Sequence, residues 1–267
     1  MTPFIGGWKK PHDTKGLALE KDYQVTGQPY PQVADVRNND SAIRDQEQEG
    51  SCTAFSSTAA MENVEAKLGL PRVILSPQYP YCKVRQVEKT WPQDAGASIL
   101  DIIKCEMKFG VPPESDWPYS DQDYNKLPPL KAILDARKDM VTALYVMKQA
   151  LDVMCDIIAS GFPFVAGIDW FSNYPTDNST KGLLPPPNGD YQGGHALEWV
   201  CYNLKATEQS SPTVQGAVIP PMCFGFKNSW GLSFGLNGYG FIPIDSLLNP
   251  NWAMEFIQIV REQIKAS

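Results

Sequence analysis

The sequence places a cysteine directly after a tight Gly-Ser pair and at the start of an apolar helical run. Gly50 and Ser51 turn the chain, and after Cys52 apolar residues recur every four positions until Gly69 ends the run. This period predicts a helix that begins at Cys52 and buries one face. A thiol in that position lies at the positive end of the helix dipole, where the thiolate is favoured.

Two later segments carry side chains that can work with such a thiol. His195 lies in the run GGHAL, and Asn228 lies in KNSWG. A cysteine nucleophile needs a neighbouring imidazole as acid and base, and a third polar group that orients the imidazole. The order therefore predicts Cys52 as nucleophile, His195 as acid and base, and Asn228 as orienting residue. Gln46 is expected to add a side-chain N–H beside the Cys52 amide, forming an oxyanion hole.

Composition narrows the class of protein. A chain of 267 residues with 43% hydrophobic residues can bury a sizeable core in one large or two small lobes. A net charge of -7 argues against binding to nucleic acid or to anionic membranes. No apolar stretch approaches the ~20 residues of a membrane span. We expect a monomer.

The cysteines point to a reducing environment. The five other than Cys52 lie in apolar stretches and are expected to be free, buried thiols. The chain has no CxxC pair, so we predict no metal site, and nothing indicates a cofactor. The N-terminal residues lack the basic-then-apolar order of a signal peptide. We expect the cytoplasm or another reducing compartment, with non-classical export left open.

The order of elements predicts an α+β protein. Helices are expected from Cys52, over 99–109 and over 144–160, and short strands over 162–168, 196–202, 223–227, 238–244 and 256–260. Helices first and strands second indicate a helical lobe, about residues 31–143, and an antiparallel β lobe, about residues 144–267. Cys52 would then face His195 and Asn228 across a cleft between the lobes.

The first 30 residues carry scattered large apolar side chains. Phe4, Ile5, Trp8 and Tyr23 are too apolar for a free tail, yet too few to make a domain. Our hypothesis is that residues 1 to about 30 run over or beside the cleft and restrict access to it. A segment that only braces the fold is the alternative.

The runs that contain Gln46 and Cys52, His195, and Asn228, together with NGY at residues 237–239, resemble motifs of the papain/cathepsin-type cysteine peptidases. The resemblance covers roughly residues 30–245. The resemblance implies a two-lobed papain-like domain, residues 31–267, that hydrolyses peptide bonds through a thioester acyl-enzyme. Two alternatives stay open: an amidase or transpeptidase that uses the same thioester, and a catalytically silent binding protein.

The chain also departs from the family pattern. Thr53 replaces the usual aromatic residue after the nucleophile, and Glu49 replaces a cysteine whose disulfide partner is missing as well. Losing both partners together is typical of a bacterial or viral member in a reducing compartment. Residues 204–222 look like an insertion between the strands that carry His195 and Asn228.

The resemblance further implies where a substrate would lie. Gly96 and Ala97 occupy the positions that pair with the substrate backbone in the family. The pocket for the side chain two residues before the scissile bond would be walled by Ile99, Gly167, Gly194 and Ala196. These walls are small or apolar, so a bulky hydrophobic side chain is expected there.

Overall fold

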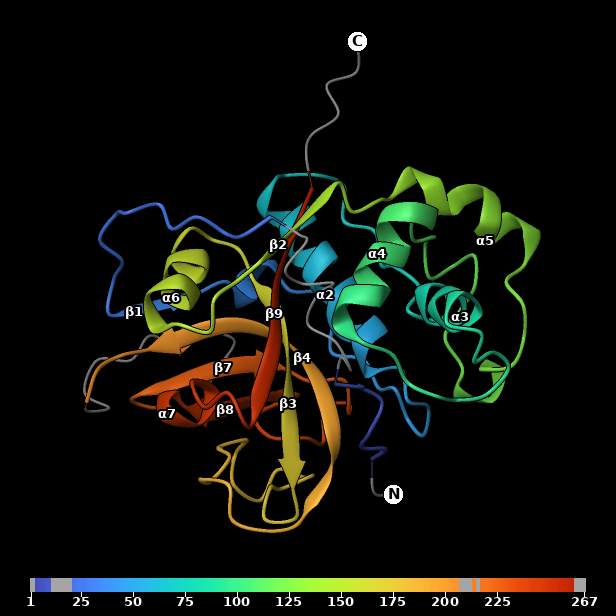
Figure 1. Cartoon of the computed structure of the whole chain (residues 1–267). Coiled ribbons are helices and arrows are strands. Elements are labelled where there is room, and N and C mark those ends of the chain that lie inside the picture. The colour runs from blue at the N-terminus through green and yellow to red at the C-terminus, as the bar shows by residue number, and fades with distance from the viewer. Residues whose placement is uncertain (1–2, 11–20, 207–212, 215–216, 262–267) are drawn as a thin grey trace.

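The structure, a computed structural model, describes residues 3–10, 21–206, 213–214 and 217–261. Helices of the first half group on one side of the molecule, and a twisted antiparallel sheet fills the other (Figure 1). The first-half helices are α2 (Cys52–Lys67), α3 (Gln78–Val87), α4 (Ile99–Phe109) and α5 (Leu130–Asp135), with the 3-10 turns η1 (Arg37–Asn39), η2 (Asp121–Asp123) and η3 (Ala136–Lys138).

Within the described residues, the sheet has seven strands. In spatial order they are β2 (Ala143–Val146), β9 (Ala253–Val260), β3 (Phe164–Phe171), β4 (Tyr191–Asn203), β7 (Cys223–Lys227) and β8 (Tyr239–Pro243), while β1 (Val33–Asp35) pairs with the last residues of β4. Helices α6 (Leu151–Ala159) and α7 (Ile244–Leu247) complete this half. A small pair, β5 (Thr213–Val214) and β6 (Ala217–Val218), lies in the segment predicted as an insertion, of which residues 207–212 and 215–216 are outside the described part.

These elements confirm the predicted α+β class. Helix α4 and strand β7 have the predicted bounds. The helix predicted over 144–160 is wrong in its first half, because Ala143–Val146 forms strand β2 and pairs with β9. Leu144 is buried in that strand, so an apolar spacing that fits a helix arises here from a strand followed by a helix.

Helix α2 joins the two halves. Its residues from Cys52 to Glu65 are all buried, since it packs against the other helices on one side and against the sheet on the other. Val165 and Ala196 of the sheet belong to the same apolar cluster as Cys52 and Met61 of the helix. This packing fixes the first turn of α2 against the middle of β4, where His195 lies.

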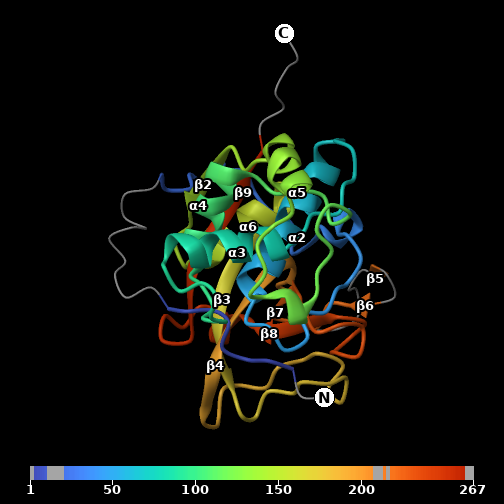
Figure 2. The same cartoon turned by 90° about the vertical axis from the view of Figure 1, so that its right-hand side faces the viewer.

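The chain before β1 divides into two described stretches. Residues 3–10, which we call the cleft segment, cross between the helices α2–α4 and the strands of the sheet (dark blue in Figure 2). Residues 21–30 lie elsewhere: Asp22 pairs with Val146 of β2, and the Tyr23 hydroxyl donates to Asp156 of α6 at 2.7 Å. Within residues 1–30, residues 1–2 and 11–20 are outside the described part. Among the described residues, no helix is long and apolar enough to cross a bilayer.

Candidate active site

Cys52 is the first residue of α2, and its sulfur faces strand β4. Ser51 makes no side-chain cap to this helix, and the Ala196 N–H of β4 points at Cys52 Sγ from 3.5 Å. The amides of Ala196, Thr53 and Cys52 all favour the thiolate, yet the side chain is 0% exposed. Burial therefore dominates and raises the pKa of Cys52 to about 12. The expectation of a favoured thiolate is wrong for this closed arrangement.

His195 lies in β4 and Asn228 directly follows the neighbouring strand β7, which brings their side chains together. His195 Nε2 lies 2.7 Å from Asn228 Oδ1, and the Ser229 N–H donates to the same oxygen at 2.8 Å. Because a backbone N–H can only donate, the atom beside Nε2 is the amide oxygen, and Nε2 must carry the hydrogen. Nδ1 then holds the lone pair, and it has no hydrogen-bond partner among the described residues.

Aromatic rings enclose the imidazole. Trp230 stacks on His195 with ring centroids 4.4 Å apart, and Trp170 meets the imidazole edge-on at 5.6 Å. The His195 side chain is fully buried, and burial lowers its pKa to about 4, although the Asn228 hydrogen bond opposes this. Burial thus opposes the charged form of both the thiol and the imidazole.

Gln46 is held close to the start of α2. Its Nε2 donates to the Glu49 carbonyl at 2.9 Å, while its Oε1 accepts from the Ser229 hydroxyl at 2.6 Å. The Gln46 backbone N–H also donates to the Ser229 carbonyl at 2.8 Å. The residue that follows Asn228 thus fixes this side chain, and one hydrogen of its amide group remains for another acceptor.

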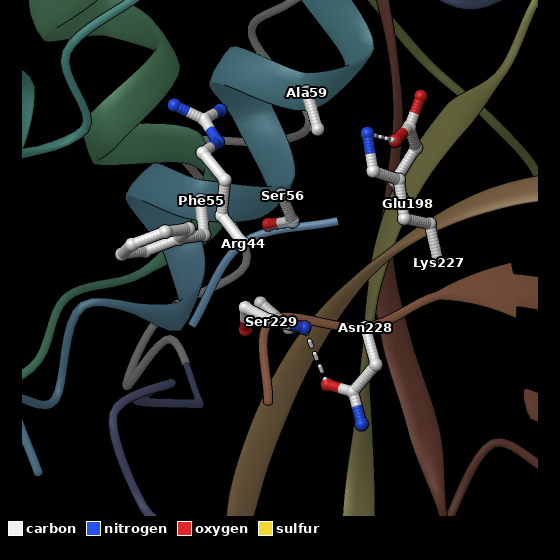
Figure 3. A pocket seen from close by; sticks show the side chains of 9 residues that line it. Arg44, Phe55, Ser56, Ala59, Glu198, Lys227, Asn228 and Ser229 are labelled. Atoms are coloured by element: carbon white, nitrogen blue, oxygen red, sulfur yellow. Dashed lines mark hydrogen bonds and ion pairs between the residues drawn. The ribbon is translucent and has the colours of Figure 1, made fainter. Parts of the chain in front are cut away.

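A small interior cavity lies behind these residues, between α2 and the sheet (Figure 3). Its volume of about 10 Å³ is close to the space of one water molecule. Lys227 Nζ lies 3.9 Å from Glu198 Oε2 on one side of it, and Arg44 and Phe55 lie on the other. The cavity is too small for a substrate and belongs to the packing between the two halves.

The cleft segment occupies the place predicted for a substrate backbone. The Ala97 N–H donates to the Gly7 carbonyl at 2.9 Å, and the Lys9 N–H donates to the Ala97 carbonyl at 3.0 Å. On the opposite wall, the Gly194 carbonyl accepts from Gly6 at 3.1 Å and from Trp8 at 3.3 Å. A Cβ on Gly96 would lie 2.3 Å from the Gly7 oxygen, so only glycine allows this approach.

The Trp8 side chain fills a pocket, which we call the Trp8 pocket, and is 2% exposed. A Cβ on Gly167 would lie 2.2 Å from the indole ring, and one on Gly194 would lie 2.7 Å from it. Ile99 and Ala196 belong to the same apolar cluster as Trp8. Two of the four residues predicted as pocket walls, Gly167 and Gly194, thus lie directly against the Trp8 ring, and the other two belong to its apolar cluster.

The sequence reasoning missed a charged residue in this pocket. The indole Nε1 of Trp8 donates to Glu255 Oε2 at 2.6 Å, and the Ile99 and Leu100 amides each donate to the same carboxyl group at 3.1 Å. Burial raises the pKa of Glu255. The available signal was a glutamate inside the mostly apolar strand β9, because such a residue needs buried partners.

Comparisons with known proteins agree with this geometry. The family model described as papain family cysteine protease matches residues 30–247. An uncharacterized peptidase C1-like protein of Acanthamoeba polyphaga mimivirus is 30% identical over 229 residues, which are 80% of this chain and 69% of the viral protein.

Solved structures show the same architecture. Xylellain, a cysteine protease from Xylella fastidiosa, has a TM-score of 0.82 and 26% identity, with 98% of this chain and 99% of that chain covered. A digestive procathepsin L2 proteinase of Tenebrio molitor has a TM-score of 0.72 at 18% identity, covering 97% of this chain and 78% of that one, which supports the fold alone. On its sequence match and its architecture, this chain belongs to the papain family of cysteine proteases.

Proposed function

We propose that this cysteine protease is a thiol endopeptidase that works through Cys52, His195 and Asn228, and that residues 3–10 keep it closed. The observation that carries the proposal is the orientation of His195. Asn228 accepts from one ring nitrogen, so the other nitrogen offers a lone pair, and the amide of Ala196 points at the Cys52 sulfur. An imidazole in this state can take up a thiol proton.

The reaction then follows in two halves. His195 Nδ1 takes the Cys52 proton, and Sγ attacks the carbonyl carbon of a peptide bond. The negative oxygen is stabilised by the Cys52 amide and the Gln46 side chain, and one such donor is typically worth about 3 kcal/mol of barrier. His195 returns the proton to the leaving nitrogen as the C–N bond breaks. It next deprotonates a water molecule, which hydrolyses the thioester and regenerates the thiol.

The cleft segment fits the role of a bound but unreactive occupant. The Ala97 N–H on the wall of the cleft donates to the Gly7 carbonyl of the segment. Trp8 forms a parallel bridge with Ala97. Only molecules whose segment has moved out can accept a substrate, so apparent affinity falls with the open fraction. The segment also hydrogen-bonds to Gly194, the residue before His195, and its Trp8 side chain belongs to the same apolar cluster as Cys52.

Cleavage of a denatured protein tests the proposed chemistry. We would use the full chain with Trp8→Ala, which empties the Trp8 pocket, and the same chain with Cys52→Ala added. The first should cut the denatured protein within the chain and should form one adduct with a thiol-directed peptide electrophile, located at Cys52 by mass spectrometry. The second should do neither, while circular dichroism shows an unchanged fold.

Equal cleavage by the two variants would contradict the assignment of Cys52 as the nucleophile. Products that carry an added amine in place of a new carboxylate would identify the acyl-transfer alternative instead. Labelling of Cys52 without any cleavage would point to the silent binding protein.

A further inference from the structure

A second side chain of the cleft segment is held as specifically as Trp8. Lys10 Nζ lies 2.6 Å from Asp169 Oδ2 of β3, and it lies 5.7 Å from the centre of the Tyr191 ring. These groups line an open hollow of about 450 Å³. The hollow is bounded by Lys10, Asp169, Phe171, Tyr191, Asn251 and Trp252.

Asp169 is unusual for a residue at the edge of an open hollow. Its side chain is only 8% exposed, and its Oδ1 has no hydrogen-bond partner among the described residues. Lys10 is the one described cation paired with it. A buried carboxylate without a partner is costly, because it has lost its hydration without compensation. When the cleft segment leaves, this group therefore needs another cation or N–H donor.

The other walls suit the same kind of ligand. Phe171 and Trp252 meet edge to face at 6.4 Å, and the Tyr191 ring lies on the side of the ammonium group. Aromatic faces attract cations through their negative electrostatic potential, and they also cover the aliphatic stem of a long basic side chain. An acid with rings around it favours lysine or arginine over an acidic or short aliphatic side chain.

The hollow adjoins the Trp8 pocket. Asp169 lies two residues beyond Gly167 on β3, so both are on the same face of the strand. Asp169 pairs with Gly194 and Gly167 pairs with Ala196, which places both beside residues of the cleft. A peptide that fills the Trp8 pocket can therefore reach Asp169 with a nearby side chain, as the protein's own N-terminus does.

We propose that Asp169, Tyr191, Phe171 and Trp252 form a second substrate subsite that binds a basic side chain, and that Lys10 occupies it while the cleft is closed. The subsite rests on the proposed peptidase function. It adds a requirement that the predicted apolar pocket does not contain: a cationic residue close to the residue in the Trp8 pocket.

The first test asks whether Asp169 binds a cation, without needing any catalysis. In the full chain, the alkylation rate of Cys52 would be compared for Lys10→Met, Asp169→Asn and the double variant. Each single change should speed alkylation about five- to tenfold, because one partly exposed charged hydrogen bond is lost. The double variant should be no faster than either single one.

Lys9→Met is the matched control. Lys9 Nζ lies 3.7 Å from Glu88 in a more exposed pair, so its loss should change the rate less than about twofold. Single changes without effect, or effects that simply multiply in the double variant, would overturn the proposal. Circular dichroism and thermal melting confirm that each variant is folded.

The second test uses substrates. The full chain with Trp8→Ala and Lys10→Met, with and without Asp169→Asn, would receive neutral peptides in which one lysine or one norleucine is moved along the sequence. At one position lysine should raise kcat/KM over norleucine about fivefold or more, and this ratio should fall to near one when Asp169→Asn removes the carboxylate. Cleavage of the neutral peptides with no such ratio at any position would overturn the subsite. Failure to cleave any peptide counts against the peptidase proposal, and the alkylation cycle then decides the subsite alone.

Discussion

Among the described residues, Asn228 contacts only one of the two nitrogens of His195, so we expect it to orient the ring rather than to take part in the chemistry. Removing its side chain leaves the Cys52 thiol and the Nδ1 lone pair in place but frees the ring to rotate. In the Trp8→Ala background we expect Asn228→Ala to lower kcat/KM about 10- to 100-fold. Cys52→Ala defines the floor of the assay. Activity at that floor, or equal to the parent, would contradict an orienting role.

Glu255 gives the Trp8 pocket a preference that its apolar walls do not have. Because the carboxyl group accepts from the Trp8 indole, the pocket should favour tryptophan over naphthylalanine, which has nearly the same shape but no N–H. We expect about a five- to tenfold difference in kcat/KM for peptides that differ only in this residue. Glu255→Gln keeps an acceptor and should keep most of the preference, whereas Glu255→Leu should remove it. The same ratio in all three proteins would show that Glu255 does not contact the substrate.

At the scale of elements, the cleft segment depends on two close approaches that only glycine allows, one at Gly7 within the segment and one at Gly167 on the wall of the Trp8 pocket. A Cβ on Gly7 would lie 2.5 Å from the Gly50 carbonyl oxygen, and one on Gly167 would lie 2.2 Å from the Trp8 ring. Gly7→Ala and Gly167→Ala should each push the segment out and speed alkylation of Cys52 about tenfold or more. Thr26→Ala is the control, since it loosens the stretch bound to Asp156 away from the cleft. Equal rates in all four proteins would leave the cleft segment a structural brace.

Some elements could be predicted because local chemistry defines both of their ends. Helix α4 begins where the Ser98 hydroxyl accepts from the Asp101 amide, and it ends at Gly110 with φ +75°. Strand β2 could not be predicted, because its apolar residues also fit a helix and only pairing with β9 decides between them. The prediction of α4 was correct because local capping defines the helix. The prediction at β2 was wrong because only pairing with a distant strand defines it.

The site shows the same division. The order of Cys52, His195 and Asn228 in distinctive runs predicted that they act together, and the fold brings His195 Nε2 and Asn228 Oδ1 within 2.7 Å. The protonation state of the thiol could not be predicted, since it depends on how deeply the folded chain buries Cys52. Glu255 and Asp169 were not recognised as pocket residues, because their partners Trp8 and Lys10 are distant in sequence.

At the scale of the whole molecule, buried acids set how stability depends on pH. Burial raises the pKa of Glu106 from 4.5 to about 8, and Glu49 and Glu65 are also raised to about 8. Between pH 4.5 and 8 the folded state then holds more protons than the unfolded state. The free energy of unfolding therefore falls as pH rises through this range. His195, lowered from 6.5 to about 4, has the opposite effect, but only below pH 6.5.

We therefore expect the melting temperature to fall between pH 6.5 and pH 8. Glu106→Gln, which replaces the acid with a neutral group of the same shape beside Ser57, should raise Tm at pH 8 by about 3–6 °C and flatten the decline. At pH 5 the variant should gain little, because Glu106 is already protonated in the folded chain. Differential scanning calorimetry at the three pH values measures this. A variant with the parent's slope would show that Glu106 does not titrate in this range.

The cleft segment is part of the same chain as the cleft in which it lies, and that chain is held again where Asp22 pairs with Val146 of β2. A ligand on such a tether faces its site at an effective concentration in the millimolar range, whatever the concentration of the protein. Dilution cannot release it, and a free peptide must outcompete a neighbour that never diffuses away. The enzyme is therefore expected to be inactive at both low and high protein concentration. Its activity would be switched on by an event that cuts or displaces the N-terminus, rather than by the arrival of substrate alone.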